Sequence, residues 1–161
     1  MNIISAVDLN WGIGKGNDLL FDIPEDKSYF RETTLNKTVI MGRKTFQSLP
    51  FGALPKRRNI ILSTCHTIEN NNIEVCRSPD DLFKLVADTH DDDLFVIGGQ
   101  EIYSLFLPFC DTAYITKIYA DGDADKYIMN FDTSSEWELD YKSDLFFYDN
   151  ISFDFNIYKR I

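Results

Sequence analysis

Thr38-Val39-Ile40-Met41-Gly42-Arg43-Lys44-Thr45 passes from a short apolar run into a glycine, two cations and a hydroxyl. The run rich in β-branched residues predicts a buried strand over residues 38–41, and the residues after the glycine predict a short helix over 43–49. A buried strand that leads directly into a helix is typical of a parallel α/β sheet.

The start of that helix carries free backbone amides and the cations Arg43 and Lys44, which together favour an anion site. A capped helix with solvated cations is the simpler interpretation of this segment alone. Ser63-Thr64 adds hydroxyls at the end of the next predicted strand. Two neighbouring strand ends with groups suited to phosphate therefore favour the functional interpretation.

The alternation of strands and helices continues on both sides of this segment. Strands are predicted over residues 2–7, 38–41, 58–63, 73–76, 94–97, 112–118 and 151–159. Helices are predicted over residues 25–35, 43–49 and 99–107, and a fourth starts at the Ser78 cap. The pattern predicts one α/β domain over residues 1–161, with helices on both faces of a mainly parallel sheet and an antiparallel C-terminal edge. Ligands of such sheets bind at the carboxyl ends of the strands.

The composition limits the classes of function. The chain has 161 residues, of which 44% are apolar and 14% aromatic, and a formal net charge of −10. These values indicate a globular protein and argue against a general nucleic-acid binder, which needs a basic surface. Residues 1–60 nevertheless hold nine basic and six acidic side chains, so a local cationic pocket is still expected there.

The ends and the cysteines point to a cytoplasmic protein. The N-terminus lacks the charged and apolar regions of a signal peptide, and no apolar run is long enough for a membrane helix. Cys65, Cys76 and Cys110 are widely spaced and odd in number, which fits reduced thiols. His66 and His90 belong to no cluster with ligand spacing, so we expect no metal site. We expect a monomer without a membrane or nucleic-acid partner.

Two glycine-rich segments suggest ligand contact. Gly98-Gly99 stands between a predicted strand and a predicted helix, where paired glycines let a ligand approach the backbone closely, although a tight turn is an alternative. Neither this pair nor Gly12-Ile13-Gly14 matches the Rossmann or P-loop motifs. Residues 11–17 instead predict a flexible loop that covers a site.

Asp26 and Phe30 are four residues apart, so they share a face of the predicted helix 25–35. An acid beside an aromatic on a core-facing surface is partly desolvated, which raises its pKa and suits it to chemistry near neutral pH. Acids in a first helical turn also occur simply to satisfy the helix dipole, so the residues alone do not single out Asp26. The run Lys56-Arg57-Arg58 is either a solvated loop or a clamp for a carboxylate.

In their order and spacing, these segments resemble the dihydrofolate reductase family, in its bacterial form, over nearly the whole chain. The segments that carry the resemblance are Ile3-Ile4-Ser5-Ala6-Val7, Gly12-Ile13-Gly14, Phe21-Asp22-Ile23-Pro24-Glu25-Asp26, Val39-Ile40-Met41-Gly42-Arg43-Lys44-Thr45-Phe46, Leu54-Pro55 to Ser63, Val96-Ile97-Gly98-Gly99 and Tyr114-Ile115-Thr116. The resemblance implies a mainly parallel eight-stranded sheet with about four helices, and NADPH as the cofactor. It further implies reduction of 7,8-dihydrofolate to 5,6,7,8-tetrahydrofolate, by hydride transfer to pterin C6 and protonation at N5.

The resemblance also implies the site residues. Asp26, buttressed by Thr116, is the implied catalytic group beside the pterin, and Arg57 is the implied partner of the glutamate-tail carboxylate. The implied substrate-binding residues are Ile4, Ser5, Asp26, Lys27, Phe30, Leu49, Leu54, Arg57, Ile97, Tyr103 and Thr116. The implied cofactor-binding residues are Ala6, Ile13, Gly14, Gly42, Arg43, Lys44, Thr45, Leu62, Ser63, Thr64, Arg77, Gly98, Gly99, Gln100, Glu101, Ile102 and Tyr103. The family joins the two glycines by a cis peptide and binds antifolate inhibitors.

Some positions depart from the family pattern. Lys27 stands where many bacterial members carry an apolar residue, and its ammonium is expected to reach water or the glutamate tail. Asp125 keeps the acid that contacts the mobile loop, although the residues after it are unusual.

Two alternatives compete with the reductase. One is an NADPH reductase of the same fold that acts on a riboflavin-pathway intermediate, which the Asp26–Phe30 face and Arg57 argue against. The other is a non-catalytic nucleotide-binding module, which needs the phosphate sites but has no use for Asp26.

Overall fold

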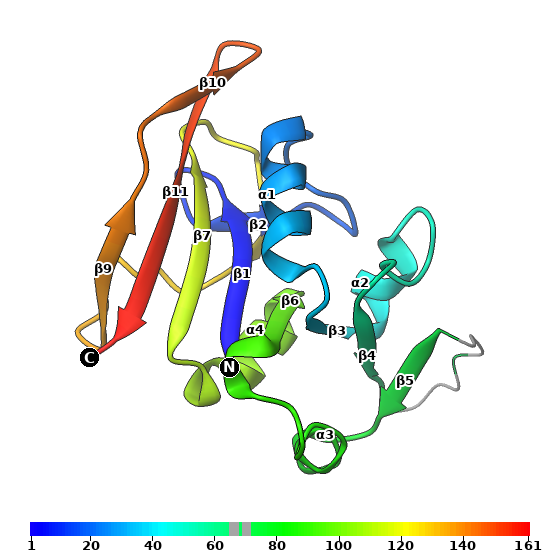
Figure 1. The fold of residues 1–161 in the computed structure, drawn as a ribbon. Helices are drawn as coiled ribbons and strands as arrows, with labels where there is room; N and C mark the ends of the chain where they lie inside the picture. The colour runs from blue at the N-terminus through cyan, green and yellow to red at the C-terminus, as the bar shows by residue number, and fades with distance from the viewer. Residues whose placement is uncertain (65–67, 69–71) are drawn as a thin grey trace.

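One large sheet runs through the molecule in the strand order β10-β11-β7-β1-β6-β3-β4-β5 (Figure 1). The computed structural model describes residues 1–64, 68 and 72–161. The strands of this sheet are β1 (Asn2–Val7), β3 (Thr38–Gly42), β4 (Arg58–Leu62), β5 (Ile73–Cys76), β6 (Leu94–Gly98), β7 (Thr112–Ile118), β9 (Trp137–Lys142), β10 (Phe146–Tyr148) and β11 (Ile151–Arg160).

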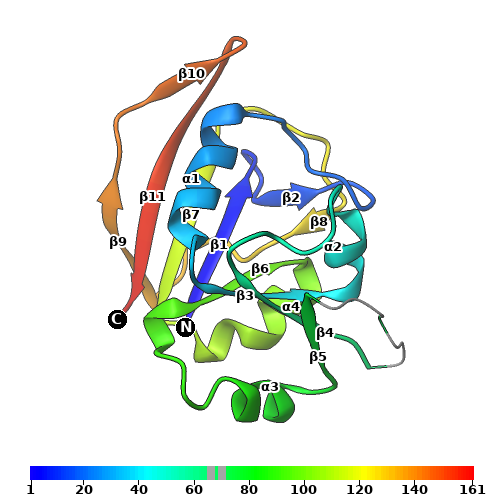
Figure 2. The ribbon, with the colours of Figure 1, turned by 45° about the vertical axis from the view of Figure 1, so that its right-hand side comes forward.

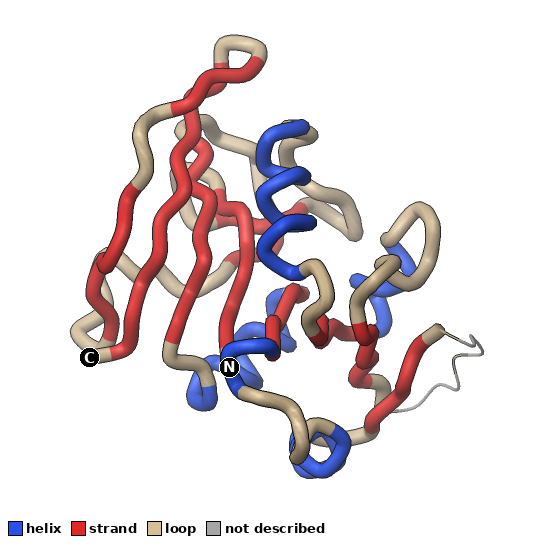
Figure 3. The backbone as a smooth tube through the Cα atoms, viewed as in Figure 1, coloured by secondary structure: helices blue, strands red, loops and turns tan. Residues whose placement is uncertain are grey.

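The sheet is parallel from β5 to β7, and β11 joins β7 in the antiparallel direction. Strands β9 and β10 pair with different parts of β11 and share the edge beyond it, so the sheet is eight strands wide. The predicted α/β fold, with its mainly parallel sheet and antiparallel C-terminal edge, is therefore confirmed. Figure 3 shows the β10–β11 hairpin extending past the ends of the neighbouring strands.

In the described part of the chain, four α-helices cover the two faces of the sheet (Figure 2). They are α1 (Pro24–Thr34), α2 (Arg43–Ser48), α3 (Pro79–Leu85) and α4 (Gln100–Phe106), and the short 3-10 turns η1 (Asp91–Asp93) and η2 (Leu107–Phe109) accompany them. The Ser78 side chain caps α3 by accepting a hydrogen bond from the Asp81 amide at 3.1 Å, as the sequence predicts.

Alternate residues of the central strands point to opposite faces and build two separate apolar cores. On one face, Ile4 and Phe95 pack with Phe46 of α2 and with residues of α1. On the other face, Ile3 and Val96 pack in a cluster that includes residues of α3 and α4. Burial on both faces explains why β1, β3, β4 and β6 are nearly continuous apolar runs.

The structure corrects the expectation for residues 11–17. Gly12–Gly14 is a short strand, β2, that pairs with β8 (Lys126–Tyr127) in a small second sheet, so part of the predicted loop is regular structure. The strands β8, β9 and β10 were not predicted. In β9, only Trp137 is buried, and all three residues of β10 are exposed, so neither strand shows the alternation that marks a half-buried strand.

Of the thiol and imidazole groups, the structure describes those of Cys76, Cys110 and His90. Cys76 and Cys110 are buried free thiols, and burial raises the pKa of the Cys110 thiol to about 12. Cys65 and His66 lie outside the described residues. Within the described part of the chain, no group of three His, Cys, Asp or Glu side chains is placed to hold a metal ion. None of the described helices has the length and apolarity to span a membrane.

Candidate active site

The carboxyl ends of β1 and β7 meet the first turn of α1, and this junction holds Asp26. Pro24 at the first helical position and the buried Ile23 before it fix the direction of the helix. Thr116, on β7 and 2% exposed, donates a hydrogen bond from its hydroxyl to Asp26 Oδ1 at 2.6 Å. Burial raises the pKa of the Asp26 carboxyl, and the bond from Thr116 opposes that shift. The structure thus combines a desolvated acid with a fixed hydroxyl.

An apolar wall lies beside this acid, because it includes Phe30, one turn after Asp26 on α1. Five of the residues that the sequence assigns to the substrate belong to one packed cluster on the α1 and α2 face, namely Ile4, Phe30, Leu49, Leu54 and Ile97. Ser5 is half-buried on β1 beside them. An apolar surface with a carboxylate beside it suits an aromatic heterocycle that bears hydrogen-bond donors on one edge.

Arg57 lies on the turn before β4, at the end of the apolar wall. Its Nη1 donates to Thr34 Oγ1 at 3.2 Å and its Nε donates to the Pro55 carbonyl at 3.0 Å. Burial and the neighbouring Arg31 lower the pKa of the Arg57 guanidinium. An anionic group would relieve the repulsion between the two cations, so this position suits a carboxylate.

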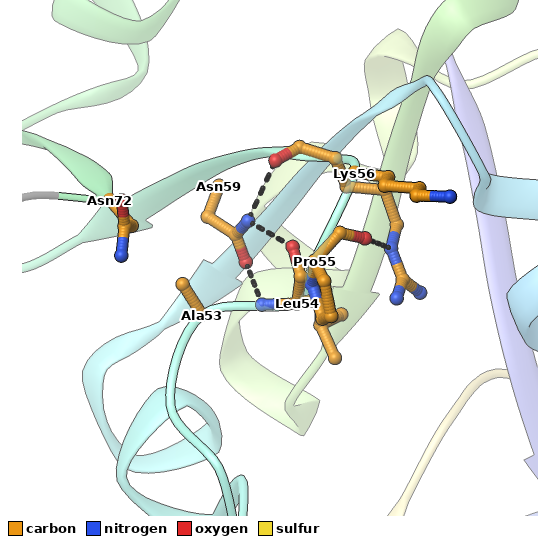
Figure 4. Close-up of a pocket in the computed structure, with 7 residues that line it drawn as sticks. Ala53, Leu54, Pro55, Lys56, Asn59 and Asn72 are labelled. Carbon is orange, nitrogen blue, oxygen red and sulfur yellow. Dashed lines mark hydrogen bonds between the residues drawn. The ribbon is translucent and has the colours of Figure 1, made fainter.

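The turn that carries Arg57 is held by a residue that sequence reasoning missed. The Asn59 side chain accepts from the Leu54 amide and donates to the Leu54 and Arg57 carbonyls, each at 2.9 Å (Figure 4). A pocket of about 370 Å³ opens beside this turn, and its lining includes Leu54, Arg57 and Asn59. Asn59 is 2% exposed, and a buried asparagine at the start of an apolar strand was the available signal.

The starts of α2 and α4 come together at the ends of the neighbouring strands β3 and β6. A Cβ on Gly42 would lie 3.0 Å from Ile102 Cγ1, and a Cβ on Gly99 would lie 3.4 Å from Thr45 Oγ1. The Gly98–Gly99 peptide is cis. The two helix starts are thus close enough to present their amides to the same ligand.

Cations and hydroxyls line this edge of the sheet. Arg43 is half-buried and donates to Gln47 Oε1 at 3.2 Å, and Lys44 is exposed beside it. Ser63 is buried at the end of β4, and Arg77 Nη1 donates to its carbonyl at 3.3 Å. A ligand with several phosphates fits this set of donors. The residues of the predicted anion site thus come together at one edge of the sheet.

The other predicted cofactor residues differ in how exposed their side chains are. Thr64 and Glu101 are exposed, whereas the Leu62 side chain is 8% exposed within the α3 and α4 core, so only its backbone is available to a ligand. Tyr103 is 5% exposed, and its hydroxyl donates to the Ile4 carbonyl at 2.7 Å. Ala6 is half-buried on β1.

The chain matches known proteins over nearly its full length. The family model described as dihydrofolate reductase matches residues 1–160. The chain belongs to the dihydrofolate reductase family. The dihydrofolate reductase of Bacillus subtilis is 36% identical over 139 residues, which cover 86% of this chain and 80% of the relative. The one from Staphylococcus haemolyticus is 35% identical over 165 residues, which cover 100% and 96%.

A solved structure agrees with these sequence relatives. Dihydrofolate reductase from Enterococcus faecalis, complexed with NADP(H) and RAB-propyl, superimposes with a TM-score of 0.86 at 28% identity and covers 99% of this chain and 95% of that one. The predicted family, enzyme class and NADPH cofactor are confirmed by these matches. The riboflavin-pathway reductase and the non-catalytic nucleotide-binding module are not supported.

Two features at the edge of the dihydrofolate reductase site involve the segment after β1. The Asp125 carboxylate accepts from the Gly16 amide at 3.1 and 3.0 Å, and the Asp125 amide donates to the Gly14 carbonyl at 3.0 Å. Lys27, the departure from the family pattern, forms an ion pair with Asp22 at 2.6 Å and is 58% exposed. The side chain is thus ion-paired and partly exposed to water.

Proposed function

We propose that this chain reduces 7,8-dihydrofolate to 5,6,7,8-tetrahydrofolate, with Asp26 and Thr116 as the groups that hold the reacting pterin. When bound, NADPH supplies the hydride for pterin C6, and a proton from solvent completes the reduction at N5. The observation that carries the proposal is the Asp26–Thr116 pair, a carboxylate and a buried hydroxyl 2.6 Å apart beside an apolar wall.

Asp26 acts on the pterin by hydrogen bonding and by charge. Its two oxygens accept from the amino group and the ring nitrogen on one edge of the heterocycle, while Thr116 also donates to one of these oxygens and fixes the carboxylate. Because burial raises the Asp26 pKa, the carboxyl can hold or release a proton nearer to neutral pH than an exposed acid. Its charge favours the reactive tautomer, and water carries the proton toward N5.

The remaining substrate contacts orient the molecule. The apolar wall binds the ring system and excludes water, which strengthens the interaction with Asp26. Arg57 pairs with the α-carboxylate of the glutamate tail. The Asn59 side chain positions Arg57 by fixing its turn.

The cofactor residues fit an anionic dinucleotide. Gly42 to Thr45 bind the pyrophosphate and, through Arg43, the 2′-phosphate, and the α4 start from Gly98 closes the opposite wall. Ala6, Ile13 and Gly14 meet the nicotinamide half. The close approach of the two helix starts, and the cations on α2, support this assignment.

Three further features complete the proposal. Antifolates bind in the apolar wall and pair with Asp26. The proposal includes a monomeric protein, with a site that one chain can supply alone. It works in the cytoplasm.

The proposal is tested by mixing the purified protein with NADPH and dihydrofolate and following the NADPH absorbance. We expect loss of absorbance that depends on both compounds. A parallel reaction with a dihydropterin that lacks the glutamate tail is expected to show a higher KM, because Arg57 has no carboxylate to bind. No loss of NADPH with dihydrofolate would refute the activity, and an equal KM for the two substrates would refute the role of Arg57.

A further inference from the structure

Asp8 is a buried acid that the proposed chemistry does not use. It follows β1 directly and is 4% exposed. Its Oδ1 accepts from the amides of Asn10 at 2.9 Å and Gly12 at 2.8 Å, and its Oδ2 accepts from the amide of Gly122 at 3.0 Å. One carboxylate thus ties the residues just after β1 to a segment more than a hundred positions later in the chain.

The two segments that Asp8 joins lie unusually close together. We call residues 9–23 the first crossing segment, which contains β2, and residues 120–125 the second crossing segment. A Cβ on Gly12 would lie 2.3 Å from Ala124 Cβ, and a Cβ on Gly122 would lie 2.8 Å from Leu20 Cδ1. Because neither glycine position has room for a side chain, the backbones approach closely enough for one carboxylate to reach both.

The chemistry of this junction requires a carboxylate. All three groups that face Asp8 are N–H donors, and an ionised carboxylate only accepts hydrogen bonds. An amide of the same shape would turn an NH2 group toward at least one of them. Among the described residues, no cation forms an ion pair with Asp8, so the backbone amides alone compensate its charge. Such charge-assisted bonds hold backbone groups firmly in place.

The first crossing segment continues from Asp8 into the proposed cofactor site. Gly12 begins β2, which carries Ile13 and Gly14, and β2 pairs with β8. The first residue of α4 meets β8 as well, because Gln100 Oε1 accepts from the Tyr127 amide at 2.7 Å. The Asp8 carboxylate therefore links the end of β1, which carries Ala6, to the first residue of the strand that carries the other proposed nicotinamide contacts.

We propose that Asp8 is a positioning residue for hydride transfer. It fixes β2 and the second crossing segment so that Ile13 and Gly14 hold the nicotinamide against the pterin. This inference rests on the proposed function, because it assumes that those residues bind NADPH. It concerns the geometry of the bound cofactor, since Asp8 touches neither substrate nor cofactor.

The test substitutes Asp8→Asn and compares it with Asn2→Ala. Asn2 is a matched control, because it is 3% exposed at the opposite end of the same strand and its side chain donates to two backbone carbonyls at 3.0 Å. For Asp8→Asn we expect an NADPH dissociation constant about tenfold higher and a single-turnover hydride-transfer rate about tenfold lower, the effect of losing one charge-assisted hydrogen bond. We expect the dissociation constant for dihydrofolate alone to change less than about twofold, because the proposed substrate residues lie outside the two crossing segments.

Loss of stability by itself predicts a different result. Asn2→Ala is expected to lower the melting temperature and leave both the NADPH affinity and the transfer rate of the folded protein unchanged. The proposal is overturned if folded Asp8→Asn binds NADPH and transfers hydride like the wild type, or if Asn2→Ala shows the same losses. A wild-type protein without NADPH oxidation would instead refute the proposed function.

A measurement on the wild type covers the case in which Asp8→Asn does not fold. Coupling between two sites is reciprocal, so if the Asp8 bonds favour NADPH binding, NADPH must favour the Asp8 bonds. We expect NADPH to slow hydrogen exchange at the Gly122 amide, which is not a predicted cofactor contact. Unchanged exchange at the Gly122 and Gly12 amides on NADPH binding would overturn the proposal.

Discussion

Substitution of Asp26 by Asn should raise the free energy of unfolding and, at the same time, lower the rate of hydride transfer. In the folded protein, burial raises the Asp26 pKa above its ordinary value of 3.8, and the Thr116 bond only partly offsets this. The folded carboxyl therefore holds its proton to a higher pH than the unfolded one. Stability falls as the pH rises from the unfolded pKa through the folded pKa, and at neutral pH the penalty for the charged form is complete. A neutral amide removes that penalty.

The size of the gain follows from two opposing effects. The asparagine oxygen can still accept from Thr116, but the bond loses its charge assistance, which costs about 1 kcal/mol. Relief of desolvation must exceed this cost, because the net shift of the Asp26 pKa is upward. We expect a net gain of about 0.5–2 kcal/mol at neutral pH, the range common for single stabilising substitutions. In a chain of this size, each kcal/mol raises the melting temperature by about 2–4 °C.

Hydride transfer is expected to fall by about 10²–10⁴-fold at neutral pH, because the pterin loses its only charged partner. Urea unfolding across a pH series measures the stability of both proteins, and single-turnover NADPH oxidation measures the chemistry. Glu25→Gln is a matched control, since Glu25 is an exposed acid in the same helical turn and its removal should shift stability by less than about 0.5 kcal/mol.

Three results would refute this reasoning. A lower stability of Asp26→Asn at neutral pH would mean that the charged carboxylate is favoured by the fold, contrary to its burial. A gain that grows toward acid pH would contradict the sign of the linkage, because protonated Asp26 carries no penalty there. An unchanged transfer rate would remove Asp26 from the reaction.

Three other substitutions test separate parts of the site and the fold. Arg43→Ala is expected to weaken NADPH binding about tenfold or more and NADH binding much less, because it removes a charged partner of the 2′-phosphate; equal losses in the two titrations would refute that role. Thr116→Val removes the hydrogen bond that lowers the Asp26 pKa, so the pKa in the pH–rate profile should move to higher pH, and a shift to lower pH would contradict the geometry. Ser78→Ala removes the α3 cap and should cost about 0.5–2 kcal/mol in urea unfolding with the turnover rate unchanged; an unaltered urea midpoint would show that the cap does not stabilise α3.

The central sheet can be predicted from the sequence, because its buried strands are recognisable as apolar or β-branched runs. Strands β1, β5 and β7 have the predicted bounds, since each is an apolar or β-branched run between polar residues. Strands β8 and β10 have only exposed residues, and they form because the chain folds back on β2 and β11. Their stability comes from partners distant in the sequence, which no local pattern reveals.

The active site likewise has parts that follow from local sequence patterns and parts that depend on residues distant in the sequence. Asp26 and Phe30 share a helical face, so the sequence alone places them together. Thr116 reaches Asp26 only through the register of β7 against β1, where Thr116 pairs with Ala6. Asn59 and Asp8 form hydrogen bonds with backbone amides and carbonyls. Because these groups do not depend on the residue type, the sequence gives no signal for the partners of such bonds.

The distribution of charge shows how the fold turns an acidic chain into a binder of anions. Consecutive acids Asp91, Asp92 and Asp93 form η1, which leads into the amino end of β6, where Asp93 pairs with Lys37 at 2.5 Å. Arg43 and Lys44 follow the carboxyl end of β3, on the neighbouring strand. Because parallel strands share one direction, this arrangement separates Asp91, Asp92 and Asp93 from Arg43 and Lys44 by the length of the strands, a distance that exceeds the screening length of about 8–10 Å. These three acids contribute to the net charge of −10 and yet do not oppose anion binding at the start of α2, where Arg43 and Lys44 set the local potential.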